Sequence, residues 1–306
     1  MYRIWNFVSE YSLLLVGGAL AALLWANTAP DSYHHLVHLP LWVDAPIGMI
    51  EEHDGLATRV LTLHFLINDM LMALFFAIAA KEVWEAVILS GGSLRGKKAL
   101  TPLIATLGGM AGPVLVYLAL AGMLGVLAEV GRGWAIPTAT DIAFSYLVGR
   151  IVFGARHPAI GFLLLLAIAD DAGGLAILAI FYPTGEVVPM WLLLSLFAAV
   201  AVWFLACWLP RRLDRGKQDR PNSTWMRRNL GAWPYVIAGC ISWYAFYRAG
   251  LHPALGLLPI VPTIPHAERD FGIFAEVERH STDLLNTIEH ALKIPVQLVL
   301  CAFGLV

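Results

Sequence analysis

The stretch that decides the fold reads Leu165-Leu166-Ala167-Ile168-Ala169-Asp170-Asp171-Ala172-Gly173-Gly174. Its two adjacent carboxylates stand near the middle of an apolar run over residues 158–182, which contains no lysine or arginine to neutralise them. That run is long enough to cross a bilayer, which takes ~20 mostly apolar residues. An ionisable group inside a span costs at least ~2.5–3.5 kcal/mol on insertion scales. The pair of acids therefore predicts a functional site within a membrane.

The whole chain has the composition of an integral membrane protein. Of its 306 residues, 59% are hydrophobic and only 14% are charged, against about 25% charged in a typical soluble domain. A net charge of −2 argues against a nucleic-acid partner. The three cysteines have neither disulfide nor metal-ligand spacing, and no motif predicts a cofactor.

The hydrophobic pattern predicts an all-α polytopic fold in one transmembrane domain over residues 1–306. Nine spans are expected, at residues 11–27, 58–82, 100–128, 136–150, 158–182, 188–209, 231–248, 250–265 and 284–306. Lysine and arginine gather in alternate loops, most densely over residues 211–228, so the positive-inside rule makes those loops and the N-terminus cytoplasmic. A cleaved signal peptide is the less favoured interpretation of the first span. Contact of the basic run with lipid headgroups is a weaker hypothesis than a topology signal.

The longest external connection, residues 28–57, carries His34, His35 and His38. Their spacing is not specific for a metal ion. A plain polar loop, or a contact between two copies of the chain, is favoured over a metal site.

The expected span over residues 136–150 is too short for a straight helix. A helix from Pro137 to Gly149 rises only about 20 Å, against a hydrocarbon core of ~30 Å. Its first residues include a proline and two threonines, which disfavour regular helical backbone. A helix broken by an extended piece would span the distance, and broken helices mark substrate sites in secondary transporters. An ordinary short, tilted helix has equal support from these residues alone.

Four aspartates fall inside expected spans: Asp69, Asp141, Asp170 and Asp171. The alternative to a functional role is a structural aspartate whose carboxylate accepts hydrogen bonds from backbone N–H groups. This alternative has more support for Asp69 than for the pair Asp170 and Asp171. Two neighbouring carboxylates shielded from water hold either a proton or a hard cation, for which oxygen ligands are suited. Competition between the two at a site that opens alternately to each side produces antiport.

Two blocks, Ala139-Thr140-Asp141-Ile142-Ala143-Phe144 and Ala167-Ile168-Ala169-Asp170-Asp171-Ala172-Gly173, resemble the NhaA family of bacterial Na⁺/H⁺ antiporters. Further matches follow in order from about residue 10 to the end, including residues 67–76 and 250–255. The resemblance implies that two residues bind the ion, Asp170 and Asp171. It implies that three support the site or a broken helix, Asp141, Thr140 and Asp69. It implies a part in pH response for two more, Glu82 and His252.

The resemblance implies a secondary active transporter of the bacterial cytoplasmic (inner) membrane rather than an enzyme. Such a protein exchanges cytoplasmic Na⁺, or Li⁺, for external H⁺ by alternating access and serves pH homeostasis. Its expected partners are Na⁺, H⁺, Li⁺, membrane lipid and a second copy of the chain in a homodimer, without a cofactor.

One departure from the family stands out. The family has twelve spans built around two inverted repeats, and the nine expected here include only the first repeat. The chain is therefore expected to be a truncated product or part of a longer one. The alternatives to transport are a non-transporting remnant and, less favoured, an intramembrane aspartyl protease. The protease usually carries a Gly-x-Gly-Asp block that this sequence lacks.

Overall fold

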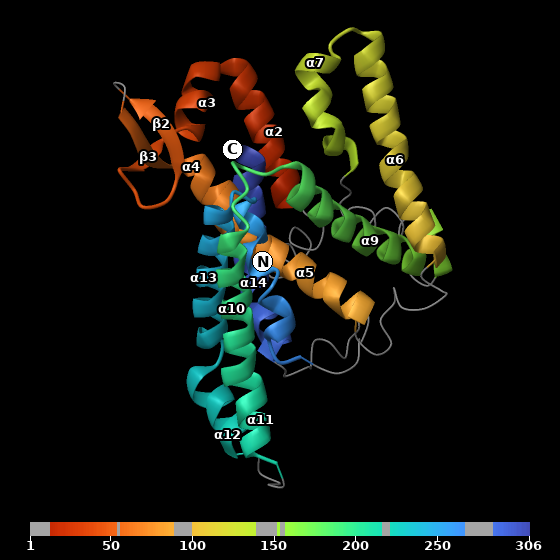
Figure 1. Cartoon of the computed structure of the whole chain (residues 1–306). Helices are drawn as coiled ribbons and strands as arrows, with labels where there is room; N and C mark the ends of the chain where they lie inside the picture. The colour runs from red at the N-terminus through yellow and green to blue at the C-terminus, as the bar shows by residue number, and fades with distance from the viewer. Residues whose placement is uncertain are drawn as a thin grey trace, which may run out of the picture.

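A computed structural model describes residues 13–53, 56–88, 100–138, 152–153, 157–215, 221–266 and 284–306. Helices dominate these ranges, and a small sheet lies beside them (Figure 1). Four of the described helical segments are long and apolar enough to cross a membrane: Leu63–Ile88, Leu100–Met123, Met190–Leu213 and Leu284–Leu305. This predominantly helical, apolar architecture agrees with the predicted multi-pass membrane protein.

The described elements follow one another along the chain in this order. The N-terminal elements are α2 Leu13–Thr28, α3 Pro30–Val37, β1 Pro40–Val43, β2 Met49–His53, β3 Leu56–Thr62, α4 Leu63–Phe65, the π-helix η1 Leu66–Leu71, α5 Met72–Ile88, α6 Leu100–Met123, α7 Leu127–Val130 and the 3₁₀-helix η3 Gly131–Thr138. The C-terminal elements are α9 Pro158–Phe181, α10 Met190–Val202, the π-helix η4 Trp203–Trp208, α11 Leu209–Leu213, α12 Pro221–Trp225, the π-helix η5 Met226–Leu230, α13 Trp233–Ala249, the 3₁₀-helices η6 Pro253–Leu257 and η7 Val261–Thr263, and α14 Leu284–Leu305.

A three-stranded antiparallel sheet, in the order β1-β3-β2, occupies part of the expected external connection. The span expected from residue 58 begins instead at Leu63, because residues 56–62 form the central strand β3. The strand gives way to the helix at Thr62, whose hydroxyl accepts a 3.2 Å hydrogen bond from the Phe65 amide. Thr62 therefore acts as the N-cap of this helical segment.

The segment expected as a span over residues 250–265 is two short 3₁₀-helices rather than one continuous helix. It contains four prolines, Pro253, Pro259, Pro262 and Pro265. Each lacks the N–H that an uninterrupted α-helix needs. The segment is nevertheless buried, since Ala254, Leu255 and Ile260 are at most 3% exposed.

Buried hydroxyls join three elements of the core. Helices α10 and α13 run side by side (Figure 1), and the hydroxyls of Ser195 and Ser242 lie 2.6 Å apart between them. The Ser242 hydroxyl also lies 2.5 Å from the carbonyl oxygen of Gly256 in η6. These contacts give a buried polar group its partners and fix η6 against α13.

Helices α2 and α14 pack closely because small residues face each other across the contact. A side chain at Gly18 would collide with the carbonyl oxygen of Cys301, and a methyl group at Gly304 would lie 2.7 Å from the carbonyl oxygen of Leu15. Close backbone approach at small residues is the usual way in which membrane helices associate. The first helix is thus packed against the last one described.

Candidate functional site

Helix α9 carries the adjacent acids through an otherwise apolar sequence. It begins at Pro158, after His157, whose ring accepts a 3.2 Å hydrogen bond from the Ala159 amide. Its 24 residues contain no charged side chain other than Asp170 and Asp171. Asp170 is buried, at 4% exposure, and Asp171 is half-buried. The two carboxylates leave the helix about 100° apart, so they meet different surroundings.

Helices α5 and α6 pack against α9 beside these acids. A buried cluster joins Ala86 of α5 to Ile168 and Ala169, the two residues that precede Asp170. On the α6 side, the Thr106 hydroxyl donates a 3.3 Å hydrogen bond to the carbonyl of Leu166. The site is therefore held by neighbours on two sides.

The next contact with α6 lies about two turns further along α9, at Gly173. A methyl group at Gly173 would come within 2.9 Å of the sulfur of Met110. The small residue after the acid pair thus admits a long α6 side chain next to the site.

Asp69 is the third described acid that the sequence places inside an expected span, and its exposure is 7%. It lies in η1, where the backbone departs from α-helical hydrogen bonding. The Asn68 amide donates a 3.3 Å hydrogen bond to its carboxylate, and the Trp243 indole donates a 2.8 Å bond to its backbone carbonyl. Short π-helical segments are rare and often occur at functional sites.

Aromatic side chains connect this segment to the sheet. The ring of Trp243 stacks on that of Tyr247 with centroids 5.8 Å apart, and Phe65 meets both edge-on. The Tyr247 hydroxyl donates a 2.8 Å hydrogen bond to the carbonyl of Gly48 and accepts a 3.2 Å bond from the Gly48 amide. Helix α13 therefore contacts both the Asp69 backbone and the turn before β2.

The two pH-response candidates lie on different elements. Glu82 is half-buried on α5, 13 positions after Asp69 and so about 20 Å along the same helical segment. His252 precedes η6, and its Nδ1 is buried without a hydrogen-bond partner in the described structure. The structure thus places these two side chains but does not join them in one cluster.

Lys81 of α5 is buried, at 2% exposure, although lysines near the end of an apolar run more often extend into water. Its ammonium group lies 3.1 Å from the carboxylate of Glu85 and 2.5 Å from that of Glu289 on α14. Neither this ion-pair cluster nor the Trp243 hydrogen bond follows from local sequence, because each joins residues far apart in the chain.

Thr140 and Asp141, which carry the predicted broken helix, lie outside the described residues. The described part of this segment is η3, which ends at Thr138. The hydroxyl of Thr138 donates a 2.6 Å hydrogen bond to the carbonyl of Ala135. The broken helix stays a prediction.

The tip of the α10–α13 hairpin is organised by Asp214. Its carboxylate accepts hydrogen bonds of 3.0 Å and 2.8 Å from the Asn222 backbone and side chain, and one of 2.8 Å from the Ser223 amide. Burial by itself would raise the pKa of Asp214, but the hydrogen bonds from Ser223 and Asn222 outweigh it and lower the pKa to about 2. Asp214 thus joins α11 to the start of α12 as a carboxylate.

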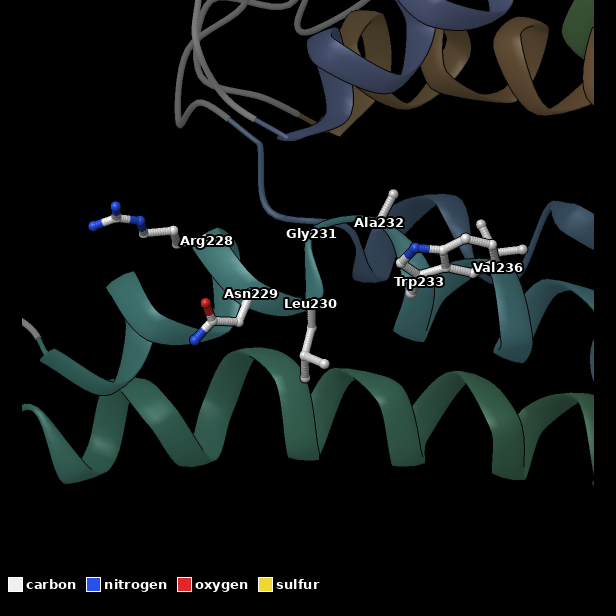
Figure 2. Close-up of a pocket in the computed structure, with 7 residues that line it drawn as sticks. All are labelled: Arg228, Asn229, Leu230, Gly231, Ala232, Trp233 and Val236. Atoms are coloured by element: carbon white, nitrogen blue, oxygen red, sulfur yellow. The ribbon is translucent and has the colours of Figure 1, made fainter.

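Close to this tip, an open pocket lies where η5 meets α13. Figure 2 shows its lining, Arg228, Asn229, Leu230, Gly231, Ala232, Trp233 and Val236. None of the predicted site residues takes part in it. Across the described ranges, no group of three or more histidine, cysteine or acidic side chains is arranged to hold a metal ion.

Comparison with known proteins gives the family. The Na⁺/H⁺ antiporter 1 family matches residues 4–306. The chain is 67% identical to the Na⁺/H⁺ antiporter NhaA of Jannaschia sp. (strain CCS1), over all of this chain and 73% of the relative. It is 45% identical to NhaA of Desulfitobacterium hafniense (strain DSM 10664 / DCB-2), over 98% of this chain and 69% of the relative.

A third relative agrees with these two. NhaA of Geobacter metallireducens is 42% identical, over 98% of this chain and 70% of the relative. The predicted resemblance is confirmed, and the relatives' names favour transport over proteolysis. The chain belongs to the Na⁺/H⁺ antiporter 1 family, that of the NhaA antiporters.

Proposed function

We propose that this protein exchanges cytoplasmic Na⁺, or Li⁺, for external H⁺, and that Asp170 and Asp171 bind the cation and the protons in turn. One observation carries the proposal: a buried carboxylate and a half-buried one are adjacent in a 24-residue apolar helix that has no basic side chain. Such a pair of acids can exist in two states that exchange needs. In one state the carboxylates are protonated, and in the other they bind a hard cation.

The packing around α9 supports alternating access at this pair. The acids follow directly on the contact with α5 and precede the close approach of Met110 from α6. A shift of α5 or α6 relative to α9 would change the side of the membrane from which ions can reach the carboxylates. Alternating access in transporters is largely rocking of one helix group against another around a fixed site.

The remaining predicted residues have supporting parts in the proposal. Asp69 shapes the site through the π-helical segment that holds it, and Asp141 and Thr140 support a broken helix beside it. Glu82 and His252 adjust the pH response. The protein resides in the bacterial inner membrane with a cytoplasmic N-terminus, in contact with lipid and as a homodimer.

Transport in everted membrane vesicles tests the proposal. Vesicles from a host without its own sodium–proton antiporters are acidified by respiration, and a fluorescent pH probe reports the loss of the gradient when NaCl or LiCl is added. We expect Asp170→Asn and Asp171→Asn to abolish the response. The matched control is Glu129→Gln, which removes an exposed carboxylate on α7 and should leave the response unchanged.

Two results would decide against the proposal. Unchanged exchange by the doubly substituted protein, present at the parent's level, would remove the acids from the mechanism. Failure of the folded 306-residue parent to respond to either cation would favour the non-transporting alternative.

A further inference from the structure

Helix α3 brings two of the three external histidines onto one face. His34 lies in the helix and His38 follows its last residue, with the His38 amide donating a 3.0 Å hydrogen bond to the His34 carbonyl. The two imidazole rings are nearly parallel, at 10°, and their centroids are 6.4 Å apart. Residues four apart on a helix are neighbours on its surface, so this juxtaposition follows from the local fold.

Both imidazoles are available to a ligand. His34 and His38 are exposed, and neither ring forms a hydrogen bond within the described residues. His35 is exposed as well, but it leaves the helix about 100° away from His34. The helix therefore presents a histidine pair on one side and a single histidine on another.

We propose that His34 and His38 bind a late first-row transition metal ion, with Zn²⁺ as the representative ligand. Two histidines four residues apart on one helical face form a known chelating arrangement, because one ring nitrogen of each can reach the same ion. Imidazole nitrogen suits zinc, copper and nickel, and bonds to zinc at about 2.0–2.1 Å. Because both side chains are exposed, small rotations can bring one nitrogen of each ring to bonding distance from a shared metal ion.

Water completes the coordination of this ion. The described residues supply no group of three or more metal-binding side chains, so the pair forms an open site rather than a closed structural one. Such a site binds more weakly than a zinc finger and exchanges its metal readily. It also differs in chemistry from the Asp170 and Asp171 pair, whose oxygen atoms suit hard cations.

The histidine pair lies next to the residue that contacts the start of a long apolar helical segment. Leu39, next to His38, accepts a 3.0 Å hydrogen bond from the amide of Leu63, where the apolar helical segment Leu63–Ile88 begins. On the topology predicted from lysine and arginine, α3 faces the outside. An external ion would reach the pair without crossing the membrane and would stiffen α3 beside that segment.

Calorimetric titration of the purified protein in detergent with ZnCl₂ at pH 7.5 tests this proposal. The affinity tag must contain no histidine, since a polyhistidine tag binds the same ions. We expect one zinc site that is at least about tenfold weaker in His34→Asn and in His38→Asn. The matched control, His35→Asn, should bind zinc like the parent, and MgCl₂ should produce no binding heat.

Thermal unfolding provides the second measurement. Zinc should raise the unfolding temperature of the parent and of His35→Asn, but not that of His34→Asn or His38→Asn. Without metal, all four proteins should have the same unfolding temperature. The proposal is overturned if the parent binds no zinc, if His34→Asn and His38→Asn bind it normally, or if His35→Asn weakens binding equally.

Discussion

The indole nitrogen of Trp243 donates a 2.8 Å hydrogen bond to the backbone carbonyl of Asp69. Asp69 lies in a π-helical turn, where the hydrogen bonding of the surrounding α-helix is interrupted. A carbonyl at such a position needs another donor when water is excluded. Trp243 supplies that donor from α13, and so fixes the backbone that carries a buried carboxylate.

Replacing Trp243 by phenylalanine tests this relationship. Trp243→Phe keeps an aromatic ring beside Tyr247 but removes the donor, leaving the carbonyl of Asp69 without it. We expect the free energy of unfolding to fall by about 1–3 kcal/mol. The measurement is thermal unfolding in detergent, with Trp203→Phe as control, since Trp203 on η4 is 44% exposed. Equal losses in the two variants would contradict the assignment.

The buried ion-pair cluster of Lys81 makes a second prediction. Lys81→Met leaves the carboxylates of Glu85 and Glu289 without their shared cation, so stability should fall by about 3 kcal/mol, the lower end of the range for a broken buried pair. Lys293→Met, at an exposed lysine on α14, should have little effect in the same unfolding assay.

A rescue experiment separates lost charge pairing from lost packing. Adding Glu85→Gln and Glu289→Gln to Lys81→Met removes the two negative charges that have lost Lys81 and should restore part of the stability. A triple variant as unstable as Lys81→Met would show that pairing is not the cause.

Gly256 allows η6 to touch α13 and gives a third prediction. A methyl group there would lie 2.5 Å from Cα of Trp243 and 3.0 Å from its amide nitrogen, and backbone atoms cannot move aside cheaply. Gly256→Ala should therefore destabilise the protein by about 1–3 kcal/mol.

A second glycine provides the control for that substitution. Gly108→Ala on α6 meets no atom within 4 Å and should be neutral or slightly stabilising. Similar unfolding temperatures for the two variants would contradict the close contact at Gly256.

The pKa of Asp214 makes a prediction about pH. Because the folded pKa is lowered to about 2 from 3.8, the carboxylate stabilises the fold above its ordinary pKa. That contribution is lost as the pH falls from about 4 towards 2. Asp214→Ala should lower the unfolding temperature at pH 6, and the difference from the parent should narrow below pH 4.

The control for this pH profile removes a carboxylate that caps nothing. Glu186→Ala acts on an exposed side chain and should match the parent throughout. A constant difference between Asp214→Ala and the parent from pH 6 to pH 3 would rule out the carboxylate as the cause.

Local sequence predicts α9 well, because a long apolar run and its acids are properties of one segment. It does not predict the sheet. The residues of β3, Leu56–Thr62, pass without a break into an apolar helical sequence, and only pairing with Pro40–Val43 and Met49–His53 marks them as a strand. Composition cannot reveal a pairing partner.

The burial of Lys81 cannot be predicted from local sequence for a related reason. Its partner Glu289 is 208 residues later in the chain, and the lysine stands near the end of an apolar run. The sequence around a lysine in that position predicts a side chain that extends towards water. Tertiary packing of α14 against α5 decides the outcome instead.

The apolar character of α9 has a consequence for how the protein is made. Its leucine, isoleucine and phenylalanine residues favour insertion by the translocon at about −0.3 to −0.6 kcal/mol each, whereas each aspartate opposes it by about 2.5–3.5 kcal/mol. Twelve such residues against two acids leave the sum close to zero. This segment therefore depends on neighbouring helices to remain in the bilayer during biogenesis, and its two acids set a limit on how easily the chain is assembled.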